Sequence, residues 1–132
     1  MIGIVPALEI EVASALDAAG VVGVPILPGQ GDGTRPDEYV SVVVEDAEYR
    51  GSAHLCTLQF RIVGPVFSAS TTTLQSRLGA VYTWATGESS PLKGYANNGL
   101  QIFGSSPANL TSEVKNNQRA EIIEFQVGAL CS

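Results

Sequence analysis

The stretch that decides the fold runs from Leu55 to Val63 and reads Leu-Cys-Thr-Leu-Gln-Phe-Arg-Ile-Val. Apolar and polar residues alternate along it. The apolar set is Cys56, Leu58, Phe60 and Ile62, and the polar set is Thr57, Gln59 and Arg61. Because successive side chains of a strand point to opposite faces, this alternation predicts a half-buried antiparallel strand. The Val-rich stretch from Tyr39 to Asp46 predicts a partner strand, joined to the first by a turn at residues 48–52.

Two amphipathic helices are predicted on either side of this hairpin. Apolar residues recur at helical spacing over residues 6–19, with Pro6 in the first turn and Gly20 at the stop. A second apolar stripe follows from Thr73 to Thr86, and Gly87 marks its end. The first stripe is Val5, Leu8, Val12, Ala15, Leu16 and Ala19, and the second is Leu74, Leu78, Val81, Tyr82 and Ala85.

The remaining segments complete an α+β pattern. Residues 21–27 predict a strand at a sheet edge, because Pro25 cannot donate a ladder hydrogen bond. Leu100 to Phe103 predicts a short strand, and Ala120 to Val127 a final one. Residues 28–38, 86–99 and 104–118 are expected to be long loops. The expected order is α-β-β-β-α-β-β, a single domain over residues 1–132 in which both helices pack on one face of a mostly antiparallel sheet.

Composition argues against several classes of partner. The net charge is −6, and the seven Lys and Arg residues are scattered along the sequence. This disfavours tight binding to nucleic acid or to an anionic membrane surface. No apolar run approaches the roughly 20 residues of a membrane span, and the first residues do not resemble a signal peptide. Charged residues make up only 15% of the chain, which leaves uncharged surface that partner subunits can bury.

Catalytic, metal and cofactor sites are not expected. His54 is the only histidine, and no Gly-x-Ser-x-Gly nucleophile motif is present. A dyad of His54 and Cys56 is geometrically conceivable, but Cys56 is in phase with the apolar set and is expected in the core. One histidine and two distant cysteines do not make a zinc set. A disulfide between Cys56 and Cys131 stays open, with reduced thiols expected in an intracellular chain.

The three long loops are the expected contact surfaces, because loops beyond about 12 residues tend to be functional or disordered. They are polar but also hold apolar side chains. We expect loops 28–38 and 86–99 to touch neighbouring subunits, with Leu92 and Tyr95 as apolar anchors. The candidate interface residues are Arg35, Asp37, Leu92, Tyr95 and Leu110.

The order of elements and several local patterns resemble the tail-terminator family of tailed phages, also called tail-completion or neck proteins. Pro36-Asp37-Glu38-Tyr39-Val40-Ser41-Val42 is similar to the family's first strand after the Gly/Pro-rich loop. The stretch from Thr57 to Gly64 looks like its central long strand. The helix from Thr73 to Thr86 and the stretch from Arg119 to Val127 resemble the elements that follow. The polar residues between Ser105 and Gln118 depart from the pattern.

The resemblance implies a structural role in a virion. Such proteins assemble as a ring, commonly a hexamer, on the last ring of the tail tube. They stop tube growth and present a surface to the head-completion or connector protein, while DNA passes through the lumen without specific binding. An acidic chain fits that role, because a repulsive lumen keeps DNA from sticking. The resemblance therefore implies a virion location in the tail or neck, after assembly in the host cytoplasm.

Three other interpretations stay open. The chain could be another neck part, such as a head-completion stopper or a minor tail protein, which composition does not distinguish. It could be a small enzyme that uses the neighbourhood of His54 and Cys56. It could also be a monomeric binding domain, which a measurement of oligomeric state would separate from a ring subunit.

Overall fold

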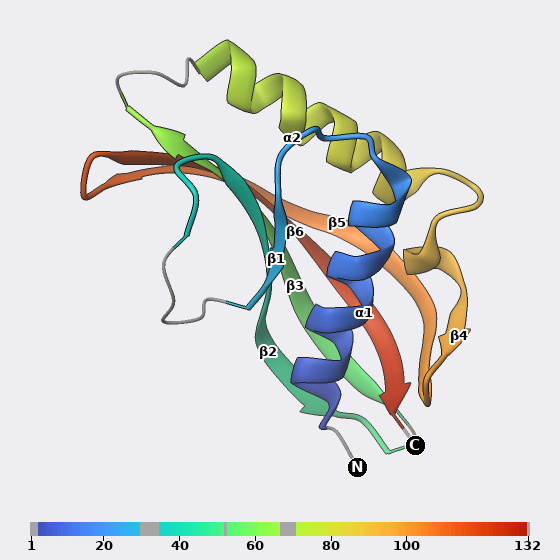
Figure 1. Cartoon of the computed structure of the whole chain (residues 1–132). Coiled ribbons are helices and arrows are strands. Elements are labelled where there is room, and N and C mark those ends of the chain that lie inside the picture. Colours follow the sequence, from blue (N-terminus) through green and yellow to red (C-terminus); the bar gives the residue numbers. More distant parts are fainter. Residues whose placement is uncertain (1–2, 30–34, 52, 67–70, 132) are drawn as a thin grey trace.

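One six-stranded sheet, covered on one face by two helices, makes up the protein in the computed structural model (Figure 1). The structure describes residues 3–29, 35–51, 53–66 and 71–131. The strand order is β1-β2-β3-β6-β5-β4, and every neighbouring pair is antiparallel except β1 and β2. The strands are β1 (Ile26–Pro28), β2 (Tyr39–Tyr49), β3 (His54–Pro65), β4 (Tyr95–Asn97), β5 (Leu100–Lys115) and β6 (Gln118–Cys131).

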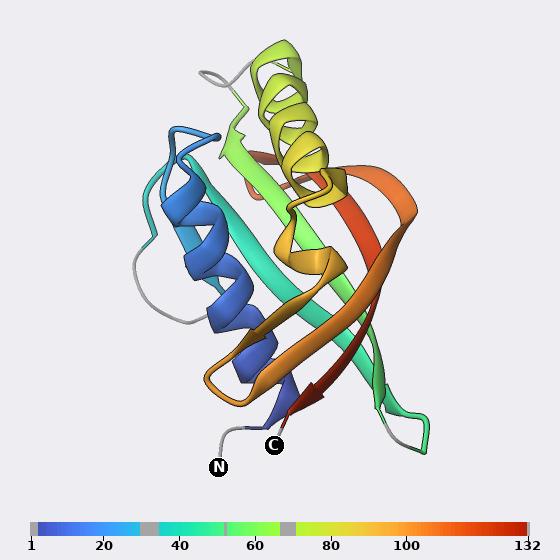
Figure 2. The same cartoon turned by 90° about the vertical axis from the view of Figure 1, so that its right-hand side faces the viewer.

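Both predicted helices are present and lie on the same face of the sheet. They are α1 (Ile4–Ala19) and α2 (Thr71–Thr86). Gly20 ends α1 with φ at 65°, a left-handed conformation that suits glycine. A short 3-10 helix, η1 (Pro91–Lys93), lies between the two helices (Figure 2). The predicted α+β class, with the helices on one face, is therefore confirmed.

The core lies between this helical layer and the sheet. The apolar set of β3 points into it, and Phe60 is one of its largest fully buried side chains. The Phe60 ring makes edge-on contacts with Phe125 at 5.8 Å and with Trp84 at 6.2 Å between ring centroids. The alternation from Leu55 to Val63 therefore predicts the buried face correctly: Cys56, Leu58, Phe60 and Ile62 have no exposed surface.

The structure corrects two expected loops. Residues 104–118 form most of β5, a two-residue turn and the start of β6, not a loop. Asn116 and Asn117 both have positive φ, the conformation that tight hairpin turns require. Polar residues fill β5 because its outer half has little core to cover. Residues 86–99 hold η1 and β4, and the turn at Asn98-Gly99 joins β4 to β5.

The first expected strand is shorter than predicted. Residues 21–27 were expected to form it, whereas β1 covers only Ile26–Pro28. Its place at the sheet edge agrees with the prediction from Pro25. The carbonyl of Pro25 accepts a hydrogen bond from the N–H of Val40 at 2.9 Å. Proline has no backbone N–H, so its carbonyl is the only backbone group with which it can bond to β2.

Candidate interaction surfaces

Leu92 is a core residue and not an exposed anchor. It lies in η1 with no exposed surface, although the polar loop around it suggested exposure. The Ser90 hydroxyl accepts a hydrogen bond from the Leu92 N–H at 3.1 Å and so fixes the start of η1. Because η1 contacts α1, α2 and β5, its leucine fills the space that the two helices leave between them.

Tyr95 is half-buried and is tied to α1. Its ring packs against the core, and its hydroxyl donates a hydrogen bond to Glu11 Oε1 at 2.8 Å. Burial raises the pKa of the Tyr95 phenol, and the neighbouring Glu11 carboxylate adds to that rise. Tyr95 therefore holds β4 against the first helix. Its assignment to a subunit interface stays a prediction.

Arg35 and Asp37 lie just before the start of β2. The Arg35 guanidinium lies 5.2 Å above the centre of the Tyr39 ring and donates to the Gly29 carbonyl at 3.1 Å. Asp37 is exposed. Residues 30–34, the middle of the loop expected to make contacts, lie outside the described residues. The interface role of Arg35 and Asp37 stays a prediction.

Leu110 is the candidate whose side chain the structure exposes most. It is 63% exposed and lies on the outer half of β5, and Val114 further along the same strand is 62% exposed. The register pairs Leu110 with Ile123, a core residue, so Leu110 lies on the helix-covered face but beyond the reach of α2. A mostly apolar hollow of about 350 Å³ separates it from Leu78 of α2. This surface is open to a partner.

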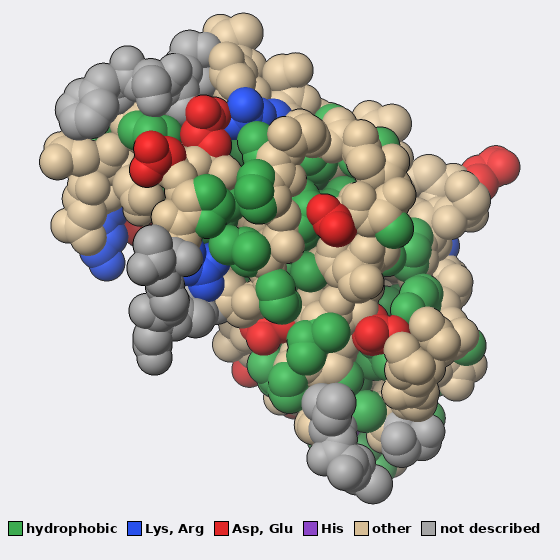
Figure 3. Space-filling view, in the orientation of Figure 1, with side chains coloured by type: hydrophobic (Ala, Val, Ile, Leu, Met, Phe, Trp, Pro, Cys, Tyr) green, Lys and Arg blue, Asp and Glu red, His purple; other side chains and the backbone are tan. Residues whose placement is uncertain are grey.

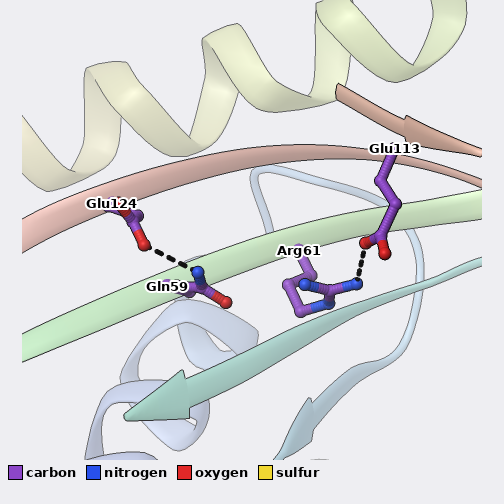
Figure 4. A network of polar contacts seen from close by, with 4 residues as sticks. All are labelled: Gln59, Arg61, Glu113 and Glu124. Carbon is purple, nitrogen blue, oxygen red and sulfur yellow. Dashed lines mark hydrogen bonds and ion pairs between the residues drawn. The ribbon is translucent and has the colours of Figure 1, made fainter. Parts of the chain in front are cut away.

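The opposite face of the sheet is covered by no helix of the described residues and carries a network of polar side chains. Gln59 donates to Glu124 at 2.7 Å, and Arg61 forms an ion pair with Glu113 at 2.6 Å (Figure 4). β6 lies between the strands of Arg61 and Glu113, so this ion pair crosses over it. Beneath it Ala120 and Ile122 are buried, at 6% and 5% exposed. The polar side chains thus shield the apolar residues on this face of the sheet from solvent.

Glu45 adds a third carboxyl to this network, next to that of Glu124. Slight desolvation of this otherwise exposed side chain raises the pKa of Glu45, and the hydrogen bond and charge of Glu124 raise it further, against smaller lowering by Arg61 and Gln59. Two neighbouring carboxyls that share a hydrogen bond resist losing both protons. The network is therefore sensitive to protonation, although the groups in it are partly open to solvent.

The fold brings together basic residues that are scattered in the sequence. Five of the seven Lys and Arg residues lie at the end of the sheet where β2 begins and the β5–β6 hairpin turns. They are Arg35, Arg61, Arg77, Lys115 and Arg119. Their scatter along the sequence thus does not carry over to the fold, because strand pairing joins distant positions. Most Lys and Arg side chains in Figure 3 accordingly lie toward one side of the view.

Internal partners balance much of this charge. Arg77 pairs with Glu38 at 2.6 Å, as Arg61 does with Glu113, and Arg119 donates to the Thr71 hydroxyl. Lys115 bonds to no described side chain. Arg35, Arg61 and Lys115 line a polar hollow of about 720 Å³ over the uncovered face, together with Tyr39, Glu113 and Gln118 among others. The hollow is suited to a polar or acidic segment.

The neighbourhood of His54 and Cys56 is built for packing. The His54 ring contacts Tyr49 edge-on at 5.2 Å, and Cys56 is a fully buried free thiol. Burial raises the pKa of Cys56, and the nearby charge of Asp46 raises it further. A raised pKa keeps the thiol protonated, which is the opposite of what a nucleophile needs. Because Cys56 is free, no disulfide joins it to Cys131.

Within the described part of the chain, no three His, Cys, Asp or Glu side chains lie close enough together to hold a metal ion. The helices of that part include none that is long and apolar enough to cross a membrane.

No protein-family model matches the chain, and no curated protein matches it either. Among solved structures, its fold is similar to that of a chain described as "Virion of native gene transfer agent (GTA) particle". The two chains share 16% sequence identity and superpose with a TM-score of 0.56. The match covers 95% of this chain and 91% of the other. At this identity the likeness establishes a shared fold over nearly the whole length of both chains.

Proposed function

We propose that this chain is a non-catalytic structural subunit of a phage-like virion. The observation that carries the proposal is the likeness to a chain of a gene transfer agent particle, which leaves little of either chain unmatched. A match of this extent concerns the whole domain and not a common motif such as a hairpin. The low share of charged residues supports the same role, since assembly subunits bury much of their surface.

Within the virion, we propose a place at the tail terminus. The chain would form a ring, a hexamer by resemblance to the tail-terminator family, that caps the tail tube and contacts the head-completion protein. The order of elements supports this choice. A stopper or a minor tail protein of related build is the alternative, and an enzyme around His54 is a weaker one because Cys56 is buried and protonated.

Deletion of the gene from a particle-producing strain tests the place in the virion. A terminator is expected to leave tails of irregular, excess length beside filled heads, seen by negative-stain microscopy. A stopper would leave heads that lose DNA, with tails of normal length. Mass spectrometry of purified wild-type particles gives the matching measurement, and the absence of the chain from them would contradict any virion role.

The enzyme alternative has its own test. We expect His54→Ala to restore particle yield to the deletion strain as fully as the wild-type gene does. A loss of yield with a folded variant would instead favour a chemical role for the histidine.

A further inference from the structure

β5 has an edge that its neighbours leave mostly open. β4 pairs only with Leu100, Gln101 and Ile102, and no other described strand lies beside the stretch from Asn109 to Lys115 on that side. The Leu110 N–H bonds to the Asn109 side chain at 2.9 Å, so it points away from β6. Because backbone groups alternate along an antiparallel strand, those of Ser112 and Val114 point outward as well. These groups form a template for another strand.

β2 has a similar open edge at the opposite side of the sheet. β1 pairs only with Val40, Ser41 and Val42, which leaves residues 43–49 without a neighbouring strand among the described residues. The Val44 N–H points out of the sheet and bonds to Glu9 at 2.9 Å. Thus each side of the sheet is covered at one end and open at the other, and the open ends are diagonally opposed.

The two open edges differ in charge. The β2 edge carries Glu45, Asp46 and Glu48, all exposed, and Arg50 pairs with Glu48 at 3.1 Å, so the edge keeps a net negative charge. The open stretch of β5 carries Glu113, whose charge Arg61 balances, and ends at Lys115 in the basic end of the sheet described above. β2 and β5 run in opposite directions within one chain, so a second copy placed beside the first without reversing its strands brings its β2 antiparallel to β5. The second copy must also be shifted along the strand direction, so that its β2 lies beside residues 109–115 of β5 and does not meet β4. This shift moves the acidic residues of its β2 toward Lys115 of the first copy.

We propose that the open edge of β5 binds the open acidic edge of β2 from a second copy, so that the sheet continues from one copy to the next. The contact is heterologous, because it joins two different surfaces, and such contacts generate rings or filaments. Alternating main-chain bonds would hold the two strands together, while the exposed side chains of Leu110 and Val114 lie beside the contact on the helix-covered face. This inference deepens the proposed virion role and rests on it.

A proline at position 114 tests the main-chain bonds. Val114 is 62% exposed and its N–H points outward, a position where an edge strand tolerates proline. Sedimentation velocity over a concentration series is expected to show self-association of the wild-type chain. Val114→Pro is expected to weaken it about tenfold or more, through loss of a main-chain bond and steric obstruction. Val114→Thr, which keeps the N–H, is the matched control and is expected to associate like wild type.

A charge exchange tests the choice of partner. Lys115→Glu and Asp46→Lys are each expected to weaken association several-fold, on the order expected of an exposed ion pair. The double variant is expected to restore association, because in every contact the glutamate at position 115 of one copy then lies near the lysine at position 46 of the next. Lys93→Glu in η1 makes the same charge change away from both edges and is expected to have no effect.

Other outcomes would overturn the inference. A wild-type chain that stays monomeric throughout, or a Val114→Pro variant that associates normally while circular dichroism shows it folded, would exclude pairing at β5. Failure of the double variant to recover would exclude the β2 edge as the occupant and favour a strand from a different protein. Such results leave the proposed function standing if the chain is still found in particles, whereas its absence from them overturns that function alone.

Discussion

Leu92 and Leu110 show at the scale of single residues how burial decides the role of a side chain. Both lie in polar surroundings in the sequence, yet Leu92 is fully buried and Leu110 is 63% exposed. Leu92→Ala is expected to cost about 2–5 kcal/mol, because it leaves a cavity between the helices. Leu110→Ala is expected to change the stability of the monomer by less than about 0.5 kcal/mol. Urea denaturation measures both, and similar losses would contradict the burial described.

Glu45 makes stability depend on pH. Its pKa in the folded chain lies above the ordinary value of 4.5, so folding favours the protonated carboxyl. The associated stability is complete below the ordinary pKa and is lost as the pH rises through the raised one. At pH 7, Glu45→Gln is therefore expected to raise the free energy of unfolding by no more than about 1 kcal/mol, because solvent screens this exposed site. A slightly higher melting temperature would show the gain. The gain should vanish at pH 4. Exposed Glu88→Gln is the control, and an equal gain there would point to net charge instead.

The β5–β6 hairpin shows at the scale of elements what the sequence conceals. β3 was predictable because one face is apolar and the other polar. β5 was not, because its outer half faces solvent on both sides and so lacks that alternation. The Asn98-Gly99 pair was a signal that could have been used, since Asn-Gly is a strong hairpin signature. The gathering of basic residues depends on register and could not be read from linear spacing.

The turn of this hairpin gives a prediction at the same scale. Asn117 has φ at 62°, which a β-branched residue adopts only with strain. Asn117→Val is expected to destabilise the protein by about 1–2 kcal/mol, whereas Asn117→Gly should be neutral or slightly stabilising. Thermal melts of the two variants at equal concentration compare them. A valine variant as stable as wild type would mean that the hairpin does not close through this turn.

The whole molecule is electrically asymmetric. Five of its seven basic residues lie at one end of the sheet, while the open edge of β2 is acidic, although the net charge of −6 suggests uniform repulsion between copies. The proposed contact removes this conflict, because pairing of the β5 edge with the β2 edge of another copy brings opposite charges together, whereas pairing of two β2 edges would not. Electrostatic complementarity of this kind mainly fixes partner choice and register.

Salt dependence follows from this asymmetry. The Debye length falls from about 30 Å at 0.01 M to about 3 Å at 1 M ionic strength, so exposed charges beyond contact distance cease to interact. Self-association of the wild-type chain, measured by sedimentation equilibrium, is expected to weaken as the sodium chloride concentration rises from about 0.01 M to about 1 M. Lys115→Glu should flatten that dependence, because it removes the attraction that salt would screen. Association that instead strengthens with salt would show that like-charge repulsion dominates, and that Leu110 and Val114 contribute more to the contact than the charges do.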